Sequence, residues 1–286
     1  MLQQLQLHLQ QLQQLTQRNN LFLRKINRGS PRFFYNFFYL PPQMNKLDSS
    51  LLSSFAPTGC LRVGINLGNP LLASLDGDTP KGITVDIATH IANKLKLPIT
   101  FTCYQMAGAT VDAVKAGDVD LVFVAIDPVR GADISYTPAY IQIEGAYMVK
   151  NCSPLTKIED VDAAGNEIVV GKGSAYDLYL TREIKQASLL RSANSQAVVD
   201  DFMSGVGNVA AGVKQQLESD AQRYEGLRML PGRFMVINQA IGTPKARVNV
   251  EKINAYLSSV IQELKTSGFI AQAMLRHKVQ GAKVAD

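Results

Sequence analysis

Short apolar segments alternate with helical segments between residues 61 and 126, and this order constrains the fold more than any other feature. Residues 61–65, 99–104 and 121–126 are rich in β-branched and aromatic side chains, whereas 85–96 and 110–116 have the spacing of helices. Strands that alternate with helices are typical of an α/β layer with parallel strand pairing. We therefore expect such a layer over this part of the chain.

The same alternation starts again after residue 146. Further strands are expected at 146–150, 167–170, 189–191 and 209–213, and further helices at 175–186, 195–204, 215–223, 249–266 and 269–276. Extended segments near 141–150 and 234–241 join the two layers, and two lobes connected in this way form a hinged cleft that closes around a small ligand. We predict a two-lobed α/β fold, with lobe 1 at 60–145 plus 239–286 and lobe 2 at 146–238.

Charge is unevenly distributed. The 286 residues carry a net charge of +5, but residues 1–46 contain six basic side chains and no acidic one, so the remaining 240 residues carry −1. A nearly neutral body does not indicate nucleic-acid binding. The three cysteines, Cys60, Cys103 and Cys152, are widely spaced and have no nearby histidines, so we predict no disulfide framework, no metal site and no cofactor. We interpret them as small buried side chains.

Residues 1–59 differ from the body. Residues 2–17 are mostly Leu and Gln, and an aromatic stretch, FFYNFFYLPP, follows at 33–42. The stretch has an internal Asn and no small-residue cleavage site, which argues against a secretory signal. The alternatives are a mitochondrial transit peptide and a disordered or non-native extension, and we favour the extension. Met44 would be a sensible start for a shorter chain.

An arginine follows one of the predicted buried strands. Residues 121–126 are apolar, Asp127 breaks the strand, and Arg130 comes next. An apolar strand cannot hold a guanidinium in its interior, so Arg130 must lie beyond the strand's end. Carboxyl ends of strands are where α/β sheets bind ligands, and an arginine there suits a carboxylate or phosphate. The alternative is a surface turn in which Arg130 pairs with Asp127 or Asp133.

A glycine- and serine-rich turn opens the predicted helix at 175–186. The segment GKGSAYDLYL contains Gly173 and then Ser174 at the N-cap position. Free backbone N–H groups and the helix dipole favour an anion at such a turn. The spacing differs from that of a nucleotide-binding phosphate loop. An ordinary strand-to-helix turn is the alternative interpretation.

With these segments in order, residues 60–280 resemble the family 3 extracellular solute-binding proteins, the amino-acid-type periplasmic binding proteins of ABC importers. The segments that carry the resemblance are LRVGINLGNP, GITVDIATHIANKLKLPITF, AVKAGDVDLVF, IDPVRGADISYTPAYI, VVGKGSAYDLYL and ELKTSGFIAQAML. The resemblance implies a periplasmic-binding-protein-like fold of type 2, with the ligand between the lobes.

The resemblance also implies roles for particular residues. Arg130 would bind the ligand's α-carboxylate, with the Gly173-Ser174 turn as the opposing donor. Polar positions at the end of the first strand would contact the ligand, here Asn66 and Asn69. The complete predicted set of ligand-binding residues is Asn66, Asn69, Ala125, Asp127, Arg130, Gly173, Ser174 and Lys214.

Three positions depart from the family pattern. Ala125 replaces a usual Ser or Thr, and Asn69 replaces an aromatic residue. The family's aspartate for the α-ammonium is replaced by Val213, followed by Lys214. Glu144 and Asp177 are the candidate substitutes, and the hypothesis is a ligand that is an organic acid or an amino acid held in an unusual way.

The resemblance implies a monomeric binding protein that delivers a small carboxylate-bearing solute to a membrane permease. It also implies a periplasmic or extracellular location, although the sequence shows no clear signal peptide and a cytoplasmic location remains an alternative. The second function is an enzyme of the cyclohexadienyl or arogenate dehydratase type on the same scaffold. Such an enzyme needs a buried general acid, for which Glu144 is the candidate.

Overall fold

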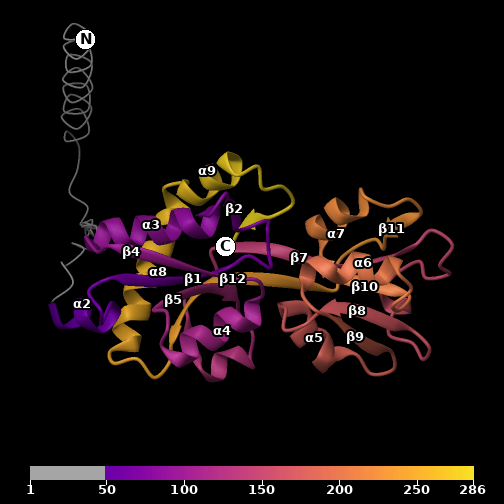
Figure 1. Ribbon diagram of the computed structural model, residues 1–286, viewed down its shortest axis with the longest axis horizontal. Helices are drawn as coiled ribbons and strands as arrows, with labels where there is room; N and C mark the ends of the chain where they lie inside the picture. Colours follow the sequence, from indigo (N-terminus) through magenta and orange to yellow (C-terminus); the bar gives the residue numbers. More distant parts are fainter. Residues whose placement is uncertain (1–48) are drawn as a thin grey trace, which may run out of the picture. The chain divides into compact units, whose positions relative to one another are not determined.

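The computed structural model describes residues 49–286, and its organising element is one mixed sheet flanked by helices (Figure 1). Along the main path of this sheet the strands follow the order β4-β1-β5-β12-β7-β10-β8-β9. The strands are β1 Leu61–Asn66, β2 Ser74–Asp76, β3 Thr79–Lys81, β4 Ile99–Tyr104, β5 Leu121–Ala125, β6 Ile134–Tyr136, β7 Ile141–Lys150, β8 Glu167–Gly171, β9 Ser188–Ser192, β10 Val209–Val213, β11 Leu227–Met229, β12 Met235–Pro244 and β13 Lys283–Val284.

Helices cover both faces of the sheet, and the two ends of the sheet with their helices form two lobes. Lobe 1 comprises β1, β4 and β5 with their flanking helices, and lobe 2 comprises β8, β9 and β10 with theirs. The α-helices are α2 Ser49–Phe55, α3 Ile83–Leu95, α4 Ala107–Ala116, α5 Ala175–Glu183, α6 Val198–Met203, α7 Lys214–Ala221, α8 Val250–Thr266 and α9 Phe269–Arg276. Parallel pairing of β1 with β4 and β5, and of β8 with β9 and β10, confirms the predicted two-lobed α/β fold.

The apolar sequence of β5 follows from burial of both its faces. Leu121 and Phe123 pack into a cluster with α3, α8 and α9, whereas Val122 and Val124 pack into a second cluster with α4. Successive side chains of a strand point to opposite faces, so a strand covered on both sides is apolar at every position. The charged residues near β5 therefore lie beyond its ends, where the site is found.

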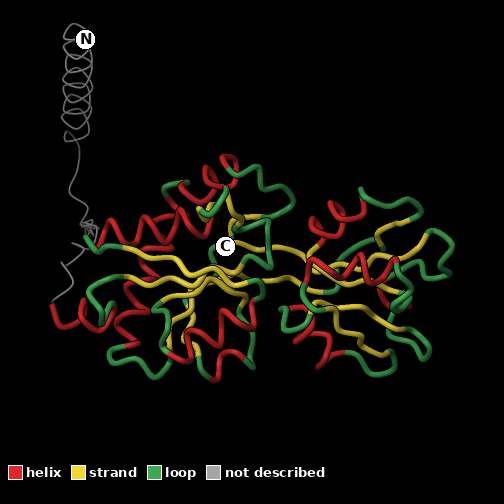
Figure 2. Tube along the Cα trace, viewed as in Figure 1, coloured by secondary structure: helices red, strands yellow, loops and turns green. Residues whose placement is uncertain are grey.

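Two long antiparallel strands run from one lobe into the other (Figure 2). β12 pairs with β5 in lobe 1, through Ala240 and Val124, and β7 pairs with β10 in lobe 2, through Met148 and Ala210. β7 and β12 also pair with each other, with Ile143 opposite Ile237. The predicted lobe limits near residues 145 and 238 fall within these crossing strands, and those exact limits remain predictions.

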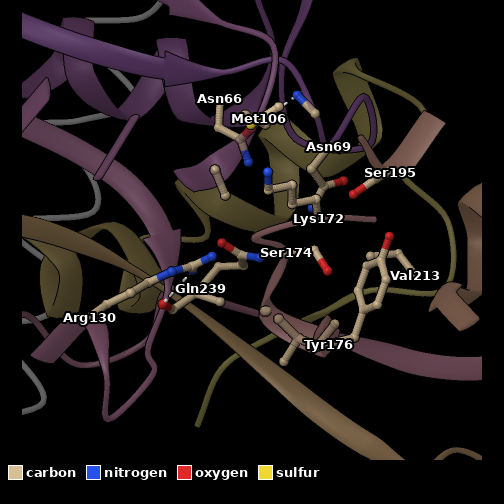
Figure 3. A pocket seen from close by; sticks show the side chains of 15 residues that line it. Asn66, Asn69, Met106, Arg130, Lys172, Ser174, Tyr176, Ser195, Val213 and Gln239 are labelled. Atoms are coloured by element: carbon tan, nitrogen blue, oxygen red, sulfur yellow. Dashed lines mark hydrogen bonds between the residues drawn. The ribbon is translucent and has the colours of Figure 1, made fainter. Parts of the chain in front are cut away.

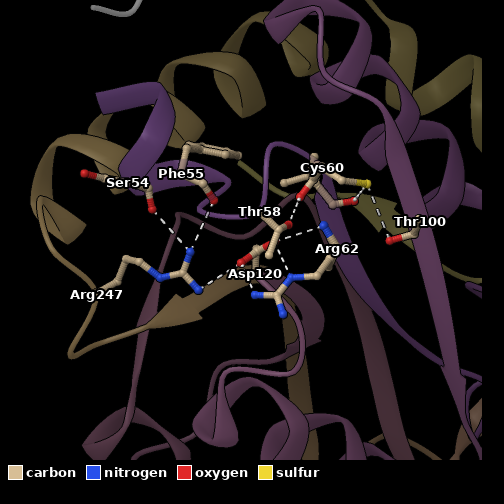
Figure 4. A network of polar contacts seen from close by, with 9 residues as sticks. Ser54, Phe55, Thr58, Cys60, Arg62, Thr100, Asp120 and Arg247 are labelled. Atoms are coloured by element: carbon tan, nitrogen blue, oxygen red, sulfur yellow. Dashed lines mark hydrogen bonds and ion pairs between the residues drawn. The ribbon is translucent and has the colours of Figure 1, made fainter. Parts of the chain in front are cut away.

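The predicted N-terminal extension, residues 1–59, is too long, because residues 49–59 belong to the folded body. They include α2 and pack onto lobe 1, with Phe55 only 2% exposed in its core. The Arg247 guanidinium donates to the carbonyl oxygens of Ser54 and Phe55 and pairs with Asp120 at 2.9 Å (Figure 4). The rest of the predicted extension, residues 1–48, lies outside the described part of the chain.

Asp120 holds several segments of lobe 1 together. Its fully buried carboxylate pairs with Arg62 on β1 at 2.8 Å and accepts the backbone N–H of Arg62 at 3.0 Å. Since Arg247 binds the same carboxylate, one acidic group connects the start of β5 with β1 and with the loop before α8. Two guanidinium groups and one backbone donor satisfy the buried charge, as a buried carboxylate requires.

Some local predictions need correction. The extended segment predicted near 141–150 is confirmed as β7, but it forms one continuous strand from Ile141, five residues before the strand predicted at 146–150, because it pairs with both lobes in turn. Cys60 and Cys103 are half-buried and Cys152 is exposed, so the prediction that all three are buried is wrong. Within residues 49–286 no helix is long and apolar enough to cross a membrane.

Candidate functional site

A small pocket lies where the carboxyl ends of β1 and β5 face the turn between β8 and α5 (Figure 3). Its cavity volume is about 40 Å³. One water molecule needs roughly 10–15 Å³ by this measure, so the space suits a compact ligand. The lining residues are Asn66, Gly68, Asn69, Met106, Ala107, Ala125, Arg130, Lys172, Ser174, Ala175, Tyr176, Ser195, Val213, Ile237 and Gln239.

Arg130 is the central cation of the pocket. It lies on a short 3₁₀ turn after β5 and is only 5% exposed. Its guanidinium donates to the carbonyl oxygen of Ala125 at 3.2 Å and, across the cleft, to that of Gly173 at 2.8 Å. These bonds use two of its five donors. Burial lowers the pKa of the guanidinium, which nevertheless stays charged.

Arg130 has no carboxylate partner. Within residues 49–286 no Asp or Glu oxygen lies within 4.0 Å of its guanidinium nitrogens, although Asp127 is close enough to raise its pKa. Asp127 instead pairs with Arg182 of lobe 2 at 2.9 Å and accepts the backbone N–H of Val129. A buried charge is normally paired, so the free donors of Arg130 indicate an anionic ligand. The alternative of a solvated surface turn does not fit a residue so buried.

The turn on lobe 2 has the geometry of a helix N-cap. The Ser174 Oγ accepts the backbone N–H of Asp177 at 3.0 Å, and the Asp177 carboxylate accepts the backbone N–H of Gly173 at 2.9 Å. Gly173 has a φ of 69°, a left-handed conformation that glycine adopts without strain. This conformation turns its carbonyl oxygen toward Arg130. The start of α5 therefore lies against the pocket, where its dipole favours negative charge.

The two predicted asparagines line the opposite wall. Asn66 Oδ1 accepts the backbone N–H of Gly68 at 3.0 Å. Asn69 is 8% exposed, and its Oδ1 is buried without a hydrogen-bond partner among the described residues. A buried acceptor without a partner costs about 1–3 kcal/mol, so the Asn69 side-chain amide is available to a ligand.

The structure brings together most of the predicted set. Asn66, Asn69, Ala125, Arg130 and Ser174 line the pocket, and Gly173 contacts Arg130 through its carbonyl oxygen. Asp127 and Lys214 do not line it. As noted, Asp127 faces Arg182, and Lys214 lies 4.0 Å from Glu144 beside a different cavity.

Neither proposed substitute for the missing aspartate reaches the pocket. Glu144 pairs with Arg233 and Lys214 and lines another cavity, of about 680 Å³, at the crossing strands. Asp177 is buried beneath the α5 turn and pairs with Arg191 at 3.0 Å. Val213 does line the pocket, and its side chain is apolar.

Sequence reasoning missed several lining residues. Lys172 carried a local signal, because it lies between two glycines before a helix. Ser195 and Gln239 carried none, because they come from distant segments that only the folded chain brings to the pocket. Among the described residues, Lys172 and Arg130 are the charged side chains of the lining, and no carboxylate lines it.

Comparison with known proteins agrees with this architecture. Residues 61–278 match the family model of bacterial extracellular solute-binding proteins, family 3, and the chain belongs to this family. Its fold is similar to that of the substrate-binding protein of an amino acid ABC transporter, with 20% identity, a TM-score of 0.66 and coverage of 78% of this chain and 100% of the other. A solute receptor for L-cysteine from Neisseria gonorrhoeae gives 19% identity, a TM-score of 0.68 and coverage of 80% and 94%.

Two further matches concern proteins linked to enzymes. An ancestral amino acid-binding protein described as a precursor of cyclohexadienyl dehydratase has a TM-score of 0.66 at 16% identity, covering 79% of this chain and 98% of the other. Membrane-bound lytic murein transglycosylase F of Aeromonas hydrophila subsp. hydrophila is 25% identical over 241 residues, or 82% of this chain. The chain spans 46% of that relative's length.

Proposed function

We propose that this protein binds a small carboxylate-bearing solute in the pocket between its lobes. The observation that carries the proposal is the buried guanidinium of Arg130, which has free donors and no carboxylate partner within residues 49–286. An arginine offers a planar fork of donors that matches a carboxylate. The family and the amino acid-binding structural neighbours support a ligand of this size.

The surroundings of Arg130 support an anion as well. Within residues 49–286 the pocket lining contains two cations and no acid. The helices α4 and α5 both begin at the pocket, with Met106 and Ser174 as their N-caps. Helix N-termini favour negative charge.

Binding would be coupled to contact between the lobes. Arg130 of lobe 1 donates to Gly173 of lobe 2, and the pair of Asp127 with Arg182 also crosses the cleft. A ligand held by groups on both sides stabilises this arrangement over a more open one, since it binds the two states with different affinity. We further propose that the ligand-bound form, as a monomer outside the cytoplasmic membrane, delivers its solute to an ABC-type permease.

Binding is favoured over catalysis by the position of Glu144. A dehydratase of the cyclohexadienyl or arogenate type needs an acid near the leaving hydroxyl. Glu144 does not line the pocket and is engaged by Arg233 and Lys214. A turnover assay with prephenate and arogenate tests the enzyme alternative directly.

Calorimetric titration tests the proposal. The protein would be titrated with a panel of monocarboxylates, dicarboxylates and α-amino acids, in parallel with Arg130→Met. We expect at least one carboxylate to bind the unaltered protein, and Arg130→Met to weaken it by about 10- to 100-fold, which corresponds to the loss of a charge-assisted hydrogen-bonded pair. Equal affinity in the two proteins would contradict the proposal.

A further inference from the structure

Lys172 gives the pocket a second cation, on the lobe opposite Arg130. It lies between β8 and α5, where its backbone N–H donates to the carbonyl oxygen of Ser192 at 3.1 Å. In Figure 3 its side chain extends into the pocket on the side of Asn66. Its ammonium makes no hydrogen bond or ion pair with residues 49–286. The backbone is thus fixed while the charge stays available to a ligand.

Three acids of the described residues that could have served the pocket are engaged elsewhere. Asp127 pairs with Arg182, Asp177 with Arg191, and Glu144 with Arg233. None of these carboxylates lines the pocket. Val213, which also lines the pocket, is apolar and offers no charge to a ligand. An ammonium moved from water into this site would lose its hydration without gaining an anionic partner.

Building on the proposed binding function, we propose that the ligand is a compact dicarboxylate without an ammonium group, and that Lys172 determines this specificity by binding the second carboxylate. Arg130 holds the first carboxylate from lobe 1, and Lys172 the second from lobe 2. One small molecule with two negative charges would pair with both cations. The cavity volume of about 40 Å³ favours a short molecule in which the two charges lie close together.

Calorimetric titration with four- and five-carbon probes tests the proposal. Succinate, L-malate and glutarate are the dicarboxylates. Succinamate has the shape of succinate but one neutral end, and L-aspartate adds an ammonium. We expect the best dicarboxylate to bind at least about 10-fold more tightly than succinamate, as for one charge-assisted contact. We expect L-aspartate to bind more weakly than succinate.

Lys172→Met supplies the decisive comparison. Lys172 is exposed, so the variant keeps the fold, and a melting temperature unchanged from that of the parent protein confirms this. The variant should lose about 10-fold in affinity for the dicarboxylate and keep its affinity for succinamate. Lys252→Met, which removes an exposed lysine on α8, is the matched control and should change neither affinity.

The outcomes separate this inference from the proposed function. If monocarboxylates or amino acids bind as tightly as every dicarboxylate, or if Lys172→Met weakens succinamate and succinate equally, the inference is wrong while carboxylate binding stands. Tighter binding of L-aspartate than of succinate would also overturn it. If no carboxylate binds at all, both the inference and the proposed function fail.

Discussion

The carboxylate of Asp120 should be the most sensitive single group in lobe 1. It is fully buried, and it accepts hydrogen bonds from the Arg62 backbone N–H, from two nitrogens of the Arg62 guanidinium and from Arg247. The substitution Asp120→Asn preserves the size of the side chain but removes its charge. Two guanidinium groups then lose their anionic partner, and the amide nitrogen faces donors.

The expected loss of stability follows from how deeply Asp120, Arg62 and Arg247 are buried. Removing one member of a fully buried ion pair costs about 3–5 kcal/mol. The side chains of Arg62 and Arg247 are 27% and 12% exposed, so water compensates part of the loss. We expect a decrease of about 3 kcal/mol in the free energy of unfolding, or roughly 6–12 °C in melting temperature for a domain of this size.

Scanning calorimetry measures this effect, with Asp200→Asn as the matched control. Asp200 also pairs with an arginine, Arg223, but both side chains are about half exposed, at 47% and 50%. Exposed pairs contribute about 0–1 kcal/mol, so the control should melt within about 3 °C of the parent protein. If Asp120→Asn melted no lower than this control, the structural role assigned to Asp120 would be wrong.

Two further variants test the contact between the lobes and the response to acid. Arg182→Met removes the ion pair with Asp127, in which the arginine side chain is partly exposed. We expect the ligand affinity measured by calorimetry to fall about 2- to 5-fold in this variant, whereas the control Arg223→Met leaves the affinity unchanged. The Asp162 carboxylate accepts hydrogen bonds from backbone N–H groups, that of Ala187 above all, and these bonds lower its pKa. Its contribution to stability is therefore present above the ordinary aspartate pKa of about 3.9 and is lost as the pH falls through the folded-state pKa. Asp162→Asn should therefore make the loss of stability in acid shallower, and a melting-temperature profile below pH 5 identical to that of the parent protein would contradict this explanation.

The layer order and Arg130 could be predicted because local sequence determines them. A strand buried on both faces must be apolar throughout, so β5 and β10 were recognisable as short apolar runs, and Arg130 had to follow the first of them. The Ser174 N-cap was likewise evident from residue type and position.

Side-chain direction at strand ends was harder to predict. Val213 and Lys214 are neighbours in sequence, yet Val213 lines the pocket and Lys214 lies beside another cavity with Glu144. Adjacent residues at a strand end point to different sides, so a sequence position next to a site residue need not belong to the site.

Contributions from distant segments could not be predicted either. Gln239 reaches the pocket from β12 and Ser195 from the segment after β9. The burial of Phe55 beneath α8 depends in the same way on a long-range contact, since its own helix α2 is short and contains four serines. Patterns along the chain do not encode such contacts.

A crystal structure of the protein with its tightest-binding carboxylate tests the central claim most directly. We predict a ligand between the lobes, with a carboxylate oxygen within hydrogen-bonding distance of the Arg130 guanidinium and close to the Ser174 turn. A ligand bound elsewhere, or one whose carboxylate lies away from Arg130, would contradict the account.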